Sequence, residues 1–182
     1  MSGDRAGTKQ FDVGIAGAGQ LARMTCLAAW PLGLRVGVLG HPGEPAVPMA
    51  AGLVEGDWQS ADDVARLGAV SGVVTLENEF VEASALAAVE AAGTPVRPGA
   101  DALARVQDKA LQKEMLRDAG LAVPRFMVAA SADAAVAAGE QLGWPLMLKA
   151  RKRGYDGYGN ATCESTADVL SLIHISEPTR LQ

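Results

Sequence analysis

Short apolar runs alternate with helix-patterned segments through the first half of the sequence. Apolar runs such as VGIAG and VVTL lack the polar alternation of a surface strand, so they predict strands buried on both faces. Strands joined through helices pair in parallel with right-handed connections, which predicts a doubly wound, Rossmann-like α/β sheet. The expected strands are Phe11–Gly17, Arg35–Leu39, Val73–Leu76 and a short Thr94–Arg97, and the expected helices are Gln20–Trp30, Asp62–Leu67 and Glu82–Ala92.

A second α/β unit is expected from about residue 106 onward. One long helix, Asp101–Ala119, leads into it, and extended chain begins at Pro124. The helix Ala132–Leu142, the apolar strand Pro145–Ala150 and a glycine-rich turn follow. One helix with two or three strands buries too little surface to be stable alone, so this unit is interpreted as the incomplete start of a domain.

These patterns divide the chain into four parts. Residues 1–10 are a polar tail that is expected to be disordered, 11–105 form the Rossmann-like domain, and 106–170 form the truncated second unit. The remaining residues 171–182, SLIHISEPTRLQ, contain none of the Ala, Gly and Val that dominate the rest. We interpret this segment as a non-native tail that resembles a translated sequencing adaptor; a natural terminal segment is the alternative.

Composition excludes several classes of protein. A chain of 182 residues with 49% hydrophobic and 20% charged residues is expected to fold, and its net charge of −5 argues against a nucleic-acid surface. No segment has the roughly 18 apolar residues that span a membrane, and the N-terminus lacks a secretory signal, which indicates a cytoplasmic protein without a membrane partner. Cys26 and Cys163 show no metal or disulfide spacing and are interpreted as buried thiols.

The first candidate site is the glycine turn between the first strand and the first helix, with Gly17, Gly19, Gln20 and Leu21. Glycines let a backbone approach a ligand closely, and free N–H groups at a helix start favour an anion such as phosphate. Glycines needed only for strand-to-helix packing are the alternative. A dinucleotide site would also need an acidic residue after the second strand, where this chain has Gly40 and His41. His41 is expected to be a surface residue.

The second candidate is Glu77 with Glu79, at the carboxyl end of a buried strand, where open α/β sheets bind their ligands. On extended chain these two carboxylates would point the same way. They are suited to hold a ribose or an amine, and a solvated loop edge is an equally good interpretation.

The third candidate is a group of cations in the second unit. Lys109 and Lys113 are one helical turn apart, and a solvated helix face explains them as well as a ligand does. Lys149 ends an apolar strand, and a charge on a buried strand needs a partner such as a phosphate. The loop Gly154–Asn160 that follows has the spaced glycines of a phosphate cover, although a plain surface turn would also explain it.

Taken in order, these motifs resemble the front half of the 5-(carboxyamino)imidazole ribonucleotide synthase family, ATP-grasp ligases of purine synthesis. The resemblance covers about residues 11–170. Its pieces are Gly17-x-Gly19-Gln20-Leu21-x-Arg23-Met24, Thr75-x-Glu77-x-Glu79, Arg97-Pro98, Gln107-Asp108-Lys109-x-x-x-Lys113, and Leu148-Lys149 leading to Gly154-Tyr155-Asp156-Gly157-x-Gly159. Together they imply a pre-ATP-grasp domain followed by the start of an ATP-grasp domain.

The resemblance also implies a reaction and its ligands: aminoimidazole ribonucleotide is carboxylated with bicarbonate at the expense of ATP, with Mg2+ as a further cofactor. The substrate-binding residues it implies are Gly17, Gly19, Gln20, Leu21, Glu77, Tyr155 and Asp156. The ATP-binding residues it implies are Lys109, Lys149, Gly154, Tyr155, Asp156, Gly157, Tyr158, Gly159 and Asn160. The full-length protein is expected to form a homodimer.

The sequence departs from the family at several points. Arg153 stands where the loop usually begins with glycine, and Tyr158 stands at a position that is usually basic. In the family the magnesium ligands lie in later sequence, so these 182 residues alone are expected to lack ligase activity. The alternatives are another ATP-grasp ligase or a formyl-transferring enzyme, an NAD-type oxidoreductase that shares the glycine turn, and a non-catalytic binding module.

Overall fold

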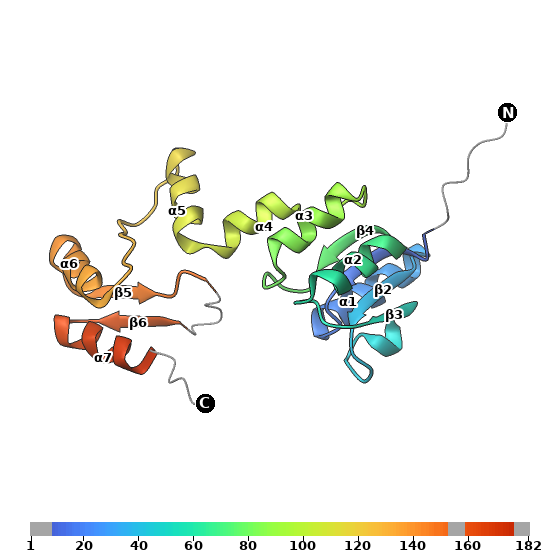
Figure 1. The fold of residues 1–182 in the computed structure, drawn as a ribbon, viewed down its shortest axis with the longest axis horizontal. Coiled ribbons are helices and arrows are strands. Elements are labelled where there is room, and N and C mark those ends of the chain that lie inside the picture. Colours follow the sequence, from blue (N-terminus) through green and yellow to red (C-terminus); the bar gives the residue numbers. More distant parts are fainter. Residues whose placement is uncertain (1–8, 153–158, 177–182) are drawn as a thin grey trace. The chain divides into compact units, whose positions relative to one another are not determined.

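The protein divides into two compact units, Met1–Val106 and Gln107–Gln182 (Figure 1). The structure, a computed structural model, describes residues 9–152 and 159–176. The first unit contains four parallel strands in the order β3-β2-β1-β4. They are β1 (Phe11–Ala16), β2 (Val36–Gly40), β3 (Gly52–Glu55) and β4 (Ser71–Leu76), which confirms the parallel α/β sheet.

Helices cover both faces of this sheet because its strands are apolar on both sides. The unit contains α1 (Gln20–Ala29), α2 (Ala61–Val70), α3 (Ala83–Ala91) and α4 (Ala100–Gln107), the last of which ends at the boundary of the second unit. One buried cluster joins the sheet residues Leu39 and Val74 to α2 and α3, and another joins Ile15 and Val38 to α1. The glycine turn therefore enters α1 from a strand that is buried on both sides.

Two strands of the first unit differ from the sequence prediction. β3 was not predicted, because its four residues lie at the sheet edge and are only half-buried or exposed. The expected strand Thr94–Arg97 is reduced to a single parallel bridge between Val74 and Val96. Pro95 and Pro98 flank Val96 and Arg97, and proline has no N–H with which to extend a ladder.

The expected long helix Asp101–Ala119 is wrong, because the chain breaks it at Asp108. Helix α4 ends at Gln107, and α5 (Lys109–Asp118) begins after an extended Asp108 with φ −107° and ψ 110°. The Asp108 carboxylate accepts hydrogen bonds from the N–H groups of Ala110 at 3.0 Å and Leu111 at 3.3 Å. Aspartate competes for the backbone donors of the next turn in this way, so it starts a helix instead of continuing one.

The second unit contains a small two-stranded sheet packed on two helices. Helix α6 (Ala132–Leu142) precedes β5 (Leu146–Lys149), which pairs antiparallel with β6 (Asn160–Cys163), and α7 (Thr166–Ser176) follows. Buried Ala135, Cys163 and Val169 form its core, with Trp144, Leu146 and Leu148 packed against them. Helix α7 continues into residues 171–176, so part of the segment interpreted as a non-native tail is helical.

Candidate functional site

The first site lies at the carboxyl edge of the parallel sheet. Strands β1 and β4 are neighbours, and their last residues Ala16 and Leu76 are paired. The glycine turn follows β1 and Glu77 follows β4, so the pairing brings them together. The backbone N–H of Glu77 donates to the carbonyl of Ala16 at 3.2 Å, which fixes the start of the loop after β4 beside the turn.

The Glu77 carboxylate binds the start of helix α1. Its Oε2 accepts a hydrogen bond from the N–H of Gly19 at 2.7 Å, and its Oε1 accepts from Leu21 at 3.2 Å and from Ala22 at 3.5 Å. These are among the N–H groups that a helix start leaves without an internal partner. The sequence predicted an anion here, and in this structure the anion is a side chain of the chain itself.

The glycines of the turn are needed for this approach. A Cβ on Gly17 would lie 2.5 Å from Oε2 of Glu77, and a Cβ on Gly19 would collide with the same carboxylate. Gly17 also has a φ of +123°, which L residues rarely adopt, whereas Gly19 has an ordinary φ of −83°. The two glycines therefore allow the Glu77 carboxylate to come close to the backbone of the turn.

Glu77 and Glu79 do not form a matched pair. Strand β4 ends at Leu76 and the chain then bends, so the extended geometry assumed for the two carboxylates does not continue. Glu77 is half-buried against the turn, whereas Glu79 is exposed. Gln20 and Leu21 begin α1 beside Glu77, and both side chains are exposed. The structure thus brings five of the proposed substrate residues together at one edge of the sheet: Gly17, Gly19, Gln20, Leu21 and Glu77.

An acidic residue that was not predicted from the sequence, Glu44, lies in the loop after β2, and its carboxylate reaches the last residue of that strand. Glu44 turns back along its loop, and its carboxylate accepts a hydrogen bond from the N–H of His41 at 2.6 Å. A Cβ on Gly40, the last residue of β2, would collide with this carboxylate. The spacing of Glu44 from the strand hid it from a search that looked directly after β2. His41 itself is exposed, as expected.

In the second unit, the hairpin brings Lys149 and Asn160 together. They face each other in the antiparallel register, and the N–H of Ala150 donates to the carbonyl of Gly159 at 2.6 Å. The expectation that Lys149 lies on a buried strand is wrong: among the described residues β5 pairs with β6 alone, and one of its faces is open. Leu146 and Leu148 pack inward while Met147 and Lys149 are exposed.

The start of α5 is tied to the end of β5. Nε of Arg151 lies 2.6 Å from Oδ2 of Asp108, and the N–H of Lys109 donates to the carbonyl of Arg151 at 3.0 Å. The hydrogen bond from Arg151 is the main cause that lowers the pKa of Asp108 below its ordinary value. Lys113 is half-buried with its Nζ 5.1 Å from the centre of the Phe126 ring, so a purely solvated helix face does not describe it.

The remaining proposed contacts, Gly154, Tyr155, Asp156, Gly157 and Tyr158, lie outside the described residues, as does Arg153.

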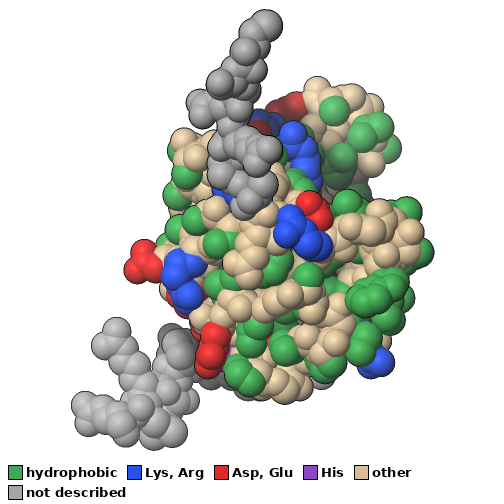
Figure 2. Space-filling model, turned by 90° about the vertical axis from the view of Figure 1, so that its right-hand side faces the viewer, with side chains coloured by type: hydrophobic (Ala, Val, Ile, Leu, Met, Phe, Trp, Pro, Cys, Tyr) green, Lys and Arg blue, Asp and Glu red, His purple; other side chains and the backbone are tan. Residues whose placement is uncertain are grey.

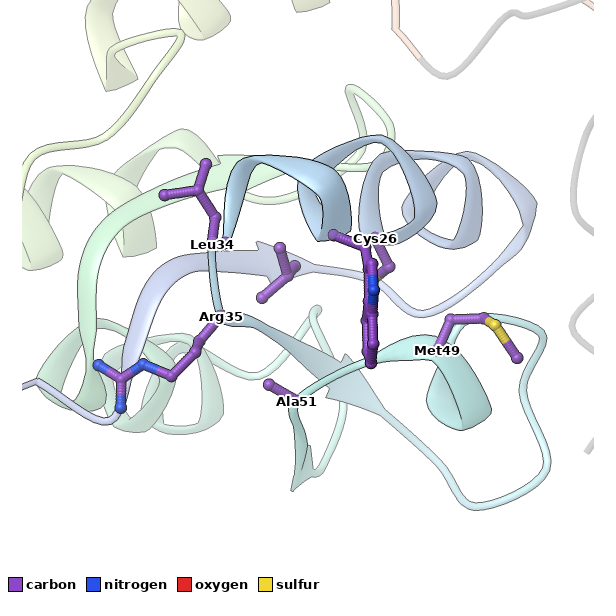
Figure 3. Close-up of a pocket in the computed structure, with 8 residues that line it drawn as sticks. Cys26, Leu34, Arg35, Met49 and Ala51 are labelled. Atoms are coloured by element: carbon purple, nitrogen blue, oxygen red, sulfur yellow. The ribbon is translucent and has the colours of Figure 1, made fainter.

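One further hollow, of about 240 Å3, lies at the opposite edge of the first sheet, where β2 begins (Figure 3). Cys26, Leu34, Met49 and Ala51 help to line it, and the guanidinium of Arg35 extends away from Cys26 and Met49 (Figure 3). Arg35 is paired with Asp12 at 3.5 Å. None of the residues that line this hollow belongs to the glycine turn, so the two sites are separate.

Charge and metal-binding groups give few further candidates. Lys and Arg side chains are scattered among acidic and apolar ones on the face drawn in Figure 2. Within residues 9–152 and 159–176, no three His, Cys, Asp or Glu side chains are grouped as metal ligands. None of the described helices is long and apolar enough to cross a bilayer.

Comparison with known families matches both units. The model of the ribonucleotide synthetase preATP-grasp domain matches residues 11–107, and that of the ATP-grasp domain matches residues 114–180. Among curated proteins, the chain is 39% identical to an N5-carboxyaminoimidazole ribonucleotide synthase of Synechococcus elongatus, over 88% of this chain and 41% of the relative. A protein of the same name from Mycobacterium tuberculosis is 34% identical, over 86% and 37%.

Solved structures give the same result. A carboxyaminoimidazole ribonucleotide synthase from Aspergillus clavatus, complexed with ATP, has a TM-score of 0.84 and 35% identity, over 93% of this chain and 45% of that one. Its complex with ADP and 5-aminoimidazole ribonucleotide has a TM-score of 0.81 and 34% identity, over 91% and 44%. The chain thus spans less than half the length of these relatives.

Proposed function

Because this chain belongs to the ribonucleotide synthetase preATP-grasp family, we propose that it forms the front part of an ATP-dependent carbon–nitrogen ligase. The complete enzyme carboxylates 5-aminoimidazole ribonucleotide with bicarbonate, giving 5-(carboxyamino)imidazole ribonucleotide, ADP and phosphate in purine synthesis. ATP phosphorylates bicarbonate, which releases ADP and gives carboxyphosphate; the exocyclic amine of the ribonucleotide then attacks the carboxyl carbon, and phosphate leaves. The proposal also includes a cytoplasmic location and, as the resemblance implies, a homodimer for the full-length protein.

One observation carries the proposal: the same relative matches both units of this chain, in the same order. The Aspergillus clavatus complex that matches 91% of this chain contains ADP and 5-aminoimidazole ribonucleotide. A dinucleotide-dependent oxidoreductase would share the first unit with its glycine turn, but it would not account for the second unit. The second match therefore favours the ligase.

The ribonucleotide is proposed to bind at the carboxyl edge of the first sheet. Glu77 is held there by the backbone of the turn, with Gln20 and Leu21 exposed beside it. A carboxylate in this position can accept a hydrogen bond from an exocyclic amine and hold it in one orientation. Since the N–H groups of Gly19, Leu21 and Ala22 already donate to Glu77, we assign the amine, and not the phosphate, to this part of the site.

ATP is proposed to bind in the second unit. Lys149, Asn160 and the backbone of Gly159 meet at one end of the hairpin, and an exposed lysine suits a phosphate oxygen. Lys109, at the start of α5, and the residues 154–158 complete the proposed contacts. Mg2+ would supply charge neutralisation on the phosphates. Since the described residues contain no cluster of metal ligands, no magnesium contact is assigned to them.

Binding measurements test this proposal directly. Titration calorimetry of the full-length enzyme, of which this chain is the front part, with 5-aminoimidazole ribonucleotide and with MgATP is expected to give one site for each ligand. Glycinamide ribonucleotide, biotin and NADH serve as competitors that represent the alternative enzymes. Tight binding of NADH without binding of the imidazole ribonucleotide would contradict the ligase, and preference for glycinamide ribonucleotide or biotin would change its substrate.

A further inference from the structure

Asp108 is exceptional because it is a buried acid at a helix start. Its exposed fraction is 2%, and among the described residues it is the only buried side chain that carries a formal charge. Burying a carboxylate costs free energy unless strong partners replace its water, so such a residue needs a specific reason.

The two oxygens of Asp108 have different partners. Oδ1 accepts the N–H groups of Ala110 and Leu111, which is an ordinary helix cap. Oδ2 instead pairs with Nε of Arg151 at 2.6 Å, 43 residues along the chain. The carbonyl of the same Arg151 accepts the N–H of Lys109 at 3.0 Å. Two independent bonds therefore connect the first turn of α5 to the chain just beyond β5.

Capping alone does not explain a buried aspartate paired with arginine. Two other helices of this chain are capped by serine: Ser60 accepts from Asp63 at 3.3 Å, and Ser131 accepts from Ala134 at 3.1 Å. An uncharged side chain is sufficient for a cap. The charge and the second oxygen of Asp108 are surplus to that role, and their effect is the connection to Arg151.

Each end of this connection is close in the chain to a lysine that we assign to ATP. Lys109 directly follows Asp108, and Lys149 is two residues before Arg151. The bonds fix the backbones that carry both lysines, although the two lysines are far apart in sequence. Small errors in the placement of binding groups weaken catalysis strongly, so sites of this kind depend on supporting contacts.

We propose that the Asp108–Arg151 ion pair is a positioning element, which holds the start of α5 against the end of β5 and so sets the spacing of Lys109 and Lys149 for the phosphates of ATP. This inference rests on the proposed function for its ligand. Asp108 itself is not assigned a contact with ATP.

The Asp108→Asn substitution separates the cap from the connection. Asparagine keeps an oxygen that accepts from Ala110 and Leu111, but its amide cannot accept from Arg151 as a carboxylate does. In hydrogen exchange, the amides of Lys109 and Ala150 are both expected to exchange faster, while those of Ala110 and Leu111 keep most of their protection. Faster exchange at Ala110 and Leu111 alone would reduce Asp108 to a cap and overturn the inference.

Calorimetry then measures the consequence for the ligand. Affinity for MgATP is expected to fall about tenfold in Asp108→Asn and in Arg151→Gln, with no further loss in the double variant, because each substitution breaks the same pair. Affinity for 5-aminoimidazole ribonucleotide is expected to be unchanged. Asp118→Asn, at the exposed end of the same helix, is the matched control and should leave both affinities unchanged.

The outcomes separate the two proposals. Additive losses in the double variant, or equal MgATP affinity in wild type and Asp108→Asn, would overturn the positioning role and leave the proposed function intact. No MgATP binding by the full-length enzyme would contradict the proposed function, and the inference would fall with it.

Discussion

Glu77 and Gly19 are 58 residues apart, yet the carboxylate of one accepts the backbone N–H of the other at 2.7 Å. The contact exists because β1 and β4 are adjacent and end at the same edge of the sheet. A glycine turn whose sequence predicts a phosphate site is therefore occupied by the carboxylate of Glu77. This changes what each glycine of the turn is expected to contribute.

Gly19→Ala is expected to destabilise the first unit by about 1–3 kcal/mol, because the new methyl group overlaps the Glu77 carboxylate. In a Glu77→Ala background this cost should largely disappear, since Gly19 has an ordinary φ of −83°. Gly17→Ala should remain costly in both backgrounds, because its φ is +123°. Urea unfolding of the three single and two double variants measures the difference, and an equal cost of Gly19→Ala in both backgrounds would contradict it.

Glu77→Gln is expected to weaken binding of 5-aminoimidazole ribonucleotide by at least about tenfold, because a charged hydrogen-bond acceptor is lost. Affinity for MgATP should stay the same, since its proposed contacts lie in the other unit. Calorimetry with both ligands tests this. Glu79→Gln, at an exposed position in the same loop, is the comparison variant. A larger effect of Glu79→Gln would move the amine contact to that residue.

Phe11→Ala is expected to cost about 3–5 kcal/mol of unfolding free energy. Phe11 is 1% exposed, and its ring lies against Gly37 and Gly52, where a Cβ on Gly52 would come within 2.8 Å of the ring. Because glycine has no side chain, Gly37 and Gly52 cannot fill the cavity that the substitution creates. Trp30→Ala is the control: Trp30 is 79% exposed, so its loss should cost under about 0.5 kcal/mol. Similar urea midpoints for the two variants would contradict the packing.

Acid is expected to weaken the contribution of Asp108 to stability. Its pKa in the folded protein is lowered from the ordinary 3.8, first by the hydrogen bond from Arg151. A lowered folded pKa stabilises the protein above pH 3.8, and this stabilisation is lost as the pH falls through the folded value. The difference in stability between wild type and Asp108→Asn should therefore be constant from pH 7 to about 5 and shrink below pH 3.8. A stability difference that grows as the pH falls would contradict a lowered pKa of Asp108.

Both cysteines are expected to react slowly with a disulfide reagent in the native protein. Cys26 and Cys163 are buried, and burial raises the pKa of each thiol, so little thiolate is present at neutral pH. In guanidinium both should react at the rate of a free thiol. Rapid native labelling of Cys26 alone would indicate that the hollow it lines opens to reagents (Figure 3).

Part of the second unit could be predicted and part could not. The helix Ala132–Leu142 and the strand around Leu146–Lys149 follow from their local apolar patterns. The break at Asp108 was missed, because the flanking residues have apolar positions near helical spacing on both sides. The exposure of Lys149 was also missed, since an apolar run does not tell whether a strand has one neighbour or two.

The sequence by itself determined three of the four strands of the first unit and their parallel α/β arrangement, because apolar periodicity is a local signal, and its motifs indicated the family. Only the tertiary structure decided which groups meet: Glu77 with Gly19, Glu44 with the end of β2, and Arg151 with Asp108. Such contacts depend on strand order and on the paths of the loops, which bring residues together across intervening chain. Local patterns do not encode those positions, so the partners of the site residues follow from the fold alone.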